Sequence, residues 1–232
     1  MGAIFAKDLP SKPAGNLRER AYDQFTHHLL ARNIRAGQFI SQRELVALTG
    51  LPLGAIRELV PRLEAEGLIR TAPQRGMQIA YIDLNLIRDA FQYRLFLERE
   101  AVALFATEAA DSVIERLRRD HAAIIAACEA AQAEGGIPAE LIDQAQATDW
   151  DLHATIVDFL GNAIIADAYR VNAIKIRLIK QEQTRLNDAL VIPTMKEHAA
   201  VIEAIASRDP AKAAAALGLH IVNARNRAMS LL

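Results

Sequence analysis

The sequence has almost no cysteine and no long apolar run. Cys128 is the only cysteine among 232 residues, which excludes an intrachain disulfide framework and a thiolate metal cluster and makes a reducing compartment the natural setting. No stretch approaches the roughly 20 consecutive apolar residues of a membrane-spanning helix. The first residues contain charges and prolines where a signal peptide would have an apolar core. These absences predict a cytoplasmic protein that makes no membrane contact.

The chain also has little net charge, −1 at neutral pH, so bulk basicity does not indicate a nucleic-acid partner. However, residues 1–80 contain 11 Lys and Arg against 7 Asp and Glu, whereas residues 81–232 contain 16 against 21. Contact with DNA phosphates requires a positive excess of the kind seen in the first part. We expect a flexible, proline-bearing tail at 1–15, a small domain at 16–81 and a larger domain at 82–232.

Two short helices separated by a tight turn are predicted after residue 40. Ser41 can cap the first helix, and Glu44 completes a capping box in front of an apolar run. Gly50 ends that helix, and Pro52 suits the first turn of a second, longer helix. A helix-turn-helix has this spacing, which sets one helix across the DNA backbone and the other in the major groove.

A β-hairpin is predicted directly after the second helix. Gly67 ends the helix, and two short apolar segments then bracket a turn that carries Arg75 at its tip. Such a two-stranded hairpin beside a helix-turn-helix forms a wing. The small domain is therefore predicted to be a winged helix-turn-helix.

From residue 82 onward the periodicity is helical and no strand pattern occurs. Asp83 can cap the first helix, and Gly161-Asn162 and Asp209-Pro210 mark two later boundaries. The expected helices are 84–110, 112–134, 137–160, 163–185, 193–207 and 209–232. The fold is thus predicted to be mainly α, with an antiparallel six-helix bundle after the winged domain.

Three of these helices carry histidine on an otherwise apolar face. Asp149 and His153 are four residues apart and share one side of a helix, while His198 and His220 lie on the apolar faces of two later helices. One carboxylate and three imidazoles could converge on a divalent cation. The alternative for each histidine is a core ring bonded to a backbone carbonyl, although burying all four groups unpaired would be costly. His121 has no comparable partner one turn away, and we assign it a structural role.

The small domain resembles the DNA-binding domain of the GntR family of bacterial transcription regulators. The resemblance rests on the capped helix, on Ile56-Arg57-Glu58, on the segment from Leu63 to Ile69 and on the glycine-bearing hairpin. It implies DNA contacts by Arg43, Arg57, Arg75 and Gly76. The alternative for the three arginines is a solvated surface position. This chain has Pro52-Leu53 where the family usually opens its recognition helix with Ser or Thr and then Arg.

The larger domain is similar to the FCD branch of the same family. The similarity falls on Asp149-Trp150-Asp151-Leu152-His153, on the segment from Glu197 to Ile202 and on His220. It implies a divalent transition metal, Zn2+ or Ni2+, held by Asp149, His153, His198 and His220. Tyr93 to Glu98 matches the family's Arg-x-x-x-Glu pattern, which implies that Arg94 grips an effector carboxylate. The alternative for Arg94 is an ion pair with Glu98 on the next turn.

These features together predict a homodimeric transcription regulator, not an enzyme, whose binding to double-stranded operator DNA is modulated by a small organic acid at the metal site. Two alternatives remain. A metal with histidine ligands and open positions also serves hydrolases, although the sequence offers no further general base, nucleophile elbow or phosphate loop. A regulator with a purely structural metal is the other. The identity of the effector and the choice between repressor and activator stay open.

Overall fold

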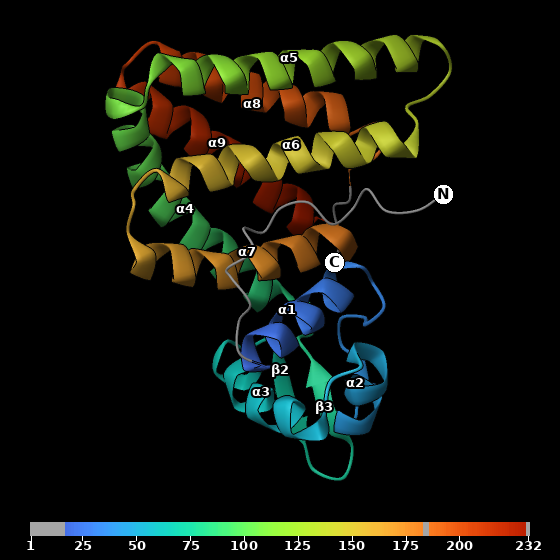
Figure 1. The fold of residues 1–232 in the computed structure, drawn as a ribbon. Coiled ribbons are helices and arrows are strands. Elements are labelled where there is room, and N and C mark those ends of the chain that lie inside the picture. The colour runs from blue at the N-terminus through green and yellow to red at the C-terminus, as the bar shows by residue number, and fades with distance from the viewer. Residues whose placement is uncertain (1–16, 183–185, 231–232) are drawn as a thin grey trace. The chain divides into compact units, whose positions relative to one another are not determined.

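The computed structural model describes residues 17–182 and 186–230. The predicted tail at residues 1–15 lies outside this range. The chain divides into two compact units, Met1–Tyr81 and Ile82–Leu232, and each is described by itself (Figure 1). No helix in the described ranges is both long enough and apolar enough to cross a membrane.

The first unit combines three helices with a small antiparallel sheet. Its elements are α1 Leu17–Leu30, β1 Phe39–Ile40, α2 Gln42–Thr49, α3 Leu53–Ala65, β2 Ile69–Ala72 and β3 Gly76–Ile79. The strand order is β1-β3-β2, with Ile40 opposite Met77 and Ile69 opposite Ile79. This confirms the winged helix-turn-helix. The prediction of a two-stranded wing omitted β1, because two residues are too few to show an alternating pattern.

Local signals set the turn between α2 and α3. The Ser41 hydroxyl accepts from the Glu44 amide at 3.2 Å, and the Glu44 carboxylate accepts from the Ser41 amide at 2.7 Å, which completes the predicted capping box. Gly50 closes α2 in the left-handed region at φ +68°. Helix α3 then turns one face into the core of the unit, where it buries Ala55, Ile56, Leu59 and Leu63.

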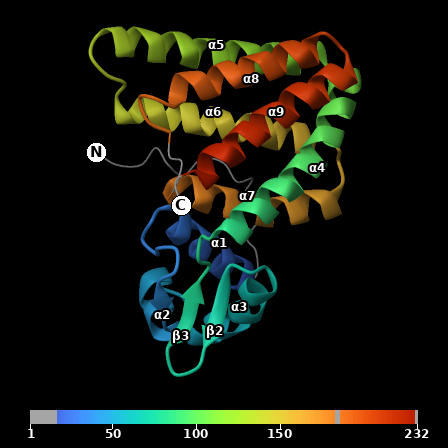
Figure 2. The same ribbon diagram turned by 180° about the vertical axis from the view of Figure 1, so that it is seen from behind.

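The second unit is a bundle of six helices, and no strand occurs in its described part. The helices are α4 Leu84–Glu108, α5 Asp111–Ala133, α6 Ala139–Asp158, α7 Ala163–Glu182, α8 Val191–Ala206 and α9 Pro210–Met229. This confirms the predicted six-helix bundle, with boundaries close to the expected ones. Helix α4 packs along α9 (Figure 2), while α5, α6 and α8 lie side by side (Figure 1).

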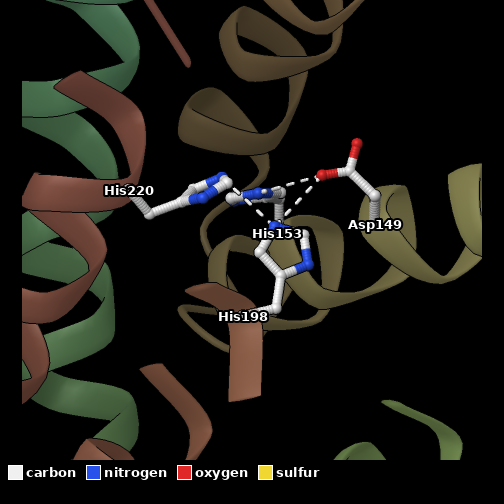
Figure 3. Close-up of side chains that lie close together, drawn as sticks. All are labelled: Asp149, His153, His198 and His220. Atoms are coloured by element: carbon white, nitrogen blue, oxygen red, sulfur yellow. Dashed lines mark hydrogen bonds and ion pairs between the residues drawn. The ribbon is translucent and has the colours of Figure 1, made fainter. Parts of the chain in front are cut away.

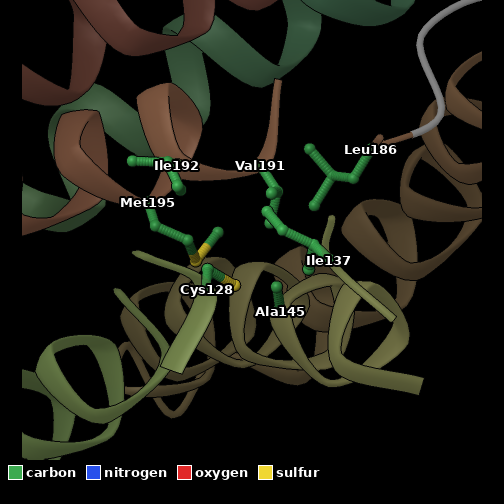
Figure 4. Packing of buried hydrophobic residues seen from close by; sticks show 7 residues of the cluster. All are labelled: Cys128, Ile137, Ala145, Leu186, Val191, Ile192 and Met195. Carbon is green, nitrogen blue, oxygen red and sulfur yellow. The ribbon is translucent and has the colours of Figure 1, made fainter. Parts of the chain in front are cut away.

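An apolar cluster joins α5, α6 and α8. Its buried members are Cys128, Ile137, Ala145, Leu186, Val191, Ile192 and Met195 (Figure 4). Burial raises the pKa of the Cys128 thiol, so this side chain packs as a small apolar group. Ala145 precedes Asp149 by one turn of α6, and Met195 precedes His198 by about one turn of α8. The cluster therefore holds in place two of the helices that carry polar groups inside the bundle.

Candidate functional site

Four polar side chains from three helices meet inside the second unit (Figure 3). Asp149 and His153 come from α6, His198 from α8 and His220 from α9, and all four are buried. One carboxylate oxygen and one ring nitrogen from each histidine all lie within 4.8 Å of one another. These are the four residues for which the sequence predicts convergence.

Carboxylates behind two of the rings determine how those rings face the cluster. Glu98 on α4 lies 2.6 Å from Nδ1 of His153, and Glu197 on α8 lies 2.8 Å from Nδ1 of His220. An ionised carboxylate only accepts hydrogen bonds, so each Nδ1 carries the proton and each Nε2 turns its lone pair toward the cluster. Burial lowers the pKa of His220 to about 4, which keeps this ring neutral at pH 7.

One carboxylate oxygen of Asp149 accepts hydrogen bonds from neighbouring side chains, and the other faces the cluster. Its Oδ2 accepts from Lys180 Nζ at 2.5 Å and from Gln146 Nε2 at 2.7 Å. Its Oδ1 has no hydrogen-bond partner in the described structure and lies 3.2 Å from His198 Nε2. Burial opposes the charge of this carboxylate, but the Lys180 ammonium and the neighbouring imidazoles hold the pKa of Asp149 well below its usual value. Asp149 therefore offers a single ionised oxygen to the cluster.

These donors fit a divalent transition metal. Atoms bound to one metal at about 2.1 Å stand roughly 3 to 3.5 Å apart, and the Nε2 atoms of His198 and His220 are separated by 3.1 Å. The distance of 3.2 Å between His198 and Asp149 falls in the same range. Imidazole nitrogens with one carboxylate suit zinc and nickel. Among the described residues, the buried His153 Nε2 and Asp149 Oδ1 have no hydrogen-bond partner, which is costly without a cation.

A small pocket borders the cluster at His153, with about 350 Å³ of empty space that includes space open to solvent. Arg94 from α4 lines it and is only 2% exposed. The Nε of Arg94 donates to Glu98 Oε1 at 2.6 Å, while Nη1 and Nη2 have no partner among the described residues. The ion pair considered as the alternative role of Arg94 is thus present, yet two donors of the same guanidinium stay available to a ligand.

Glu98 connects this pocket with the cluster of ligands. Its Oε1 accepts from Arg94 and from the Tyr169 hydroxyl at 2.8 Å, and its Oε2 faces His153. Burial opposes ionisation, but the Arg94 guanidinium and the His153 ring lower the pKa of Glu98 to about 2. One carboxylate therefore positions the arginine of the pocket and sets the tautomer of a metal-ligand candidate.

Two further groups of the site were missed in the sequence. Lys180 is 5% exposed although it follows an apolar run on α7, and this exception on an apolar stripe was the available signal. Glu197 adjoins His198 in sequence, and neighbouring residues on a helix face different ways, so nothing indicated that it contacts His220. The Nδ1 of His121 donates to the Leu117 carbonyl at 2.8 Å, and its ring meets the His198 ring edge to face, with the centroids 5.4 Å apart.

The first unit exposes the three arginines assigned to DNA. Arg43 lies on α2, Arg57 on α3 and Arg75 in the turn between β2 and β3. None of the three forms an ion pair in the described ranges, so their charges are free to meet phosphates. The backbone at position 76 requires glycine, because φ is +82° and an added Cβ would lie 2.8 Å from the Ile40 carbonyl oxygen. The DNA contacts of these four residues stay predictions.

Comparison with known proteins identifies both parts of the chain. Residues 17–79 match the gntR family of bacterial regulatory proteins, and residues 89–223 match the FCD domain. The Nta operon transcriptional regulator of Aminobacter aminovorans is 33% identical over 86 residues, a match that covers 37% of this chain and 41% of that protein. The aligned part is therefore less than half of the relative's length.

Solved structures share the fold over nearly the whole chain. E. coli McbR/YncC superposes with a TM-score of 0.71 at 15% identity and covers 93% of this chain and 98% of its own. A protein described as a transcriptional regulator GntR from Rhodococcus sp. RHA1 gives the same TM-score, identity and coverage. At this level of identity the two structures indicate a shared fold and carry no residue roles.

Proposed function

Since this chain belongs to the GntR family of bacterial regulatory proteins and carries an FCD domain, we propose that it regulates transcription by binding operator DNA in response to a small carboxylate. The family consists of regulators of transcription and not of enzymes. One observation carries the effector part of the proposal. A buried set of four metal donors adjoins a pocket in which Arg94 keeps two unused hydrogen-bond donors.

The DNA-binding part involves the exposed residues of the first unit. Arg57 on α3 would reach base edges or phosphates in the major groove, while Arg43 and the turn with Arg75 and Gly76 would hold the adjacent backbone. One recognition helix reads too few base pairs to be selective, so the protein is proposed to act as a homodimer on a symmetric operator. Its place of action is the cytoplasm, where bacterial DNA lies.

In the second unit, Asp149, His153, His198 and His220 would hold Zn2+ or Ni2+. The bound metal would supply a Lewis-acidic centre for an anionic ligand. Arg94 would grip the ligand carboxylate through its free Nη atoms, an arrangement that guanidinium geometry favours. The ligand alters operator affinity only to the extent that it prefers one conformation of the protein.

Arg57→Ala provides the test of DNA binding. With the intergenic DNA upstream of its gene, the wild-type protein should bind at low salt, and the variant should bind about tenfold more weakly or worse with a salt dependence reduced by about one unit. Arg119→Ala, at an exposed position of α5, is the matched control and should bind normally. If the wild-type protein does not bind this DNA at low salt, the proposal of a regulator is refuted.

Elemental analysis provides the test of the metal. The purified chain should carry about one transition metal, and His198→Ala should lose most of it, because affinity depends on a complete ligand set. His27→Ala, on α1 of the other unit, should keep full occupancy. Full occupancy in His198→Ala would contradict the ligand assignment. Metal loss that unfolds the bundle, together with unchanged carboxylate binding in Arg94→Met, would favour a purely structural metal.

A further inference from the structure

A second guanidinium lines the pocket, and no described acid forms an ion pair with it. Arg177 lies half-buried on α7, and its Nε is enclosed without a hydrogen-bond partner. Within the described ranges it forms no ion pair, and the Trp150 ring faces it with a centroid 5.1 Å from the guanidinium carbon. Burial lowers the pKa of Arg177, which reflects the cost of holding this charge away from water.

The other charges around the pocket are already paired. Glu98 faces Arg94 at 2.6 Å, and Asp149 faces Lys180 at 2.5 Å. The remaining positive charge is therefore that of Arg177, to which a metal in the neighbouring cluster would add more. Arg94, although paired through Nε, also retains two unused donors. A ligand whose single negative charge is held by Arg94 beside the metal cluster would leave Arg177 without an anionic partner.

We propose that the ligand of this pocket is a small dianion, with one anionic group held by Arg94 beside the metal cluster and the other by Arg177. The inference rests on the proposed function, since it specifies the effector of the same site. Dicarboxylates have this chemistry, and phosphorylated acids offer the same two anionic groups with a higher total charge. One anionic group of the ligand is assigned to each guanidinium, Arg94 from α4 and Arg177 from α7.

The pocket also limits the length of such a ligand and the polarity of its central part. The enclosed part of the pocket is small, so only a short ligand fits beside its lining. Much of the remaining lining is apolar, with Trp150, Ala154 and Ile176. A short carbon skeleton would pack against these side chains while its ends meet the arginines. A monoanion of the same shape would desolvate Arg177 and leave it unpaired, which is how a polar site rejects an analogue that lacks the matching group.

Trp150 makes the test direct, because it is the only tryptophan of the chain and lines the pocket. Its fluorescence should be followed while metal-loaded, full-length protein is titrated with matched pairs: succinate against succinamate, glutarate against glutaramate, and phosphoglycolate against glycolate. In at least one pair the dianion should bind about tenfold more tightly or better than its partner, the scale of one charged hydrogen bond. The phosphate pair and the carboxylate pairs distinguish the two sources of the second charge.

Arg177→Met should reduce this preference to about twofold or less and leave the weaker affinity for the monoanion in place, since the substitution keeps an apolar stem of similar length. Arg177→Lys should retain part of the preference. The matched control is Arg170→Met, on the same helix but outside the pocket lining, where the arginine pairs with Asp167 at 2.8 Å. It should behave as the wild-type protein.

The proposal is overturned if no dianion binds, if dianions and monoanions bind equally, or if Arg177→Met keeps the preference. Should Arg177→Met fail to fold, the wild-type pairs alone still decide between the first two outcomes and the expected one. DNA binding and metal content are measured on the same preparations. If the protein binds DNA and metal but does not prefer dianions, only this inference is refuted. If it binds neither DNA nor metal, the proposed function is refuted.

Discussion

Replacing Glu98 with glutamine should weaken metal binding without altering any of the four proposed ligands. The amide has one acceptor oxygen and an NH2 group that only donates. If the oxygen stays with Arg94 Nε and the Tyr169 hydroxyl, the NH2 group faces Nδ1 of His153. The proton of this ring must then move to Nε2, which loses the lone pair that it presents to the cluster. The reversed amide would instead place two donors against each other at Arg94.

The structure sets the size of both effects. A carboxyl pKa of about 2 against an ordinary 4.5 corresponds to about 3 kcal/mol of stability at neutral pH. Removing one partner of a buried ion pair costs a similar amount, about 3 to 5 kcal/mol, and Arg94 is only 2% exposed. We therefore expect the metal-free variant to lose about 3 kcal/mol of unfolding free energy. Metal affinity should fall about 10- to 100-fold, as for other residues that orient a ligand.

Two assays separate these effects. Urea unfolding of metal-free protein gives the stability, and competition with a coloured chelator gives the metal affinity. Glu100→Gln, at an exposed position of the same helix, is the matched control and should change neither quantity. If Glu98→Gln binds metal as tightly as the wild-type protein, then Glu98 does not set the tautomer of His153 and the reasoning is refuted.

Two further predictions concern the backbone and the pH dependence. Gly76→Ala should destabilise the first unit by more than about 1 kcal/mol, because its φ is +82° and the new Cβ meets the Ile40 carbonyl, whereas Gly54→Ala in open space on α3 should be neutral or stabilising in thermal melts. The unfolding free energy of metal-free protein should fall by up to about 1.4 kcal/mol per pH unit as pH drops from about 6.5 to about 4. In this range His220 binds a proton in the unfolded chain but not in the folded protein, where its pKa is about 4. The unfolding free energy should fall again between pH 4.5 and 2 as Glu197, whose folded pKa is about 2, is protonated; urea titrations with a flat profile above pH 4.5 would contradict the first part.

Helix boundaries were predictable because their signals are local. The capping box of Ser41 and Glu44 forms as expected, and after α6 the chain turns at Gly161, with φ +59°, before Asn162 caps α7 by accepting from two backbone amides. Each device requires only residues within one turn of each other. Strand β1 was missed because its pairing with β3 depends on a residue almost 40 positions away, Met77 opposite Ile40.

The candidate site was predictable in part for a different reason. Asp149, His153, His198 and His220 each interrupt an apolar helix face, and such an interruption is visible in the sequence. Their partners are not. Nothing in the sequence places Glu98 of α4 against His153 of α6, or Lys180 of α7 against Asp149, because those contacts depend on which helices become neighbours and at what register.

The sequence by itself determined a winged helix-turn-helix, a helical bundle and a short set of inward-facing polar groups, since periodicity and caps act over a few residues. Only the tertiary structure decided that Glu98 contacts both Arg94 and His153, and that Arg177 lines the same pocket with no ion-pair partner in the part of the chain that the structure describes. The physical reason is that the charge balance of a buried site is a sum over side chains from several helices. The charge balance of the site therefore cannot be read from any single segment of the sequence.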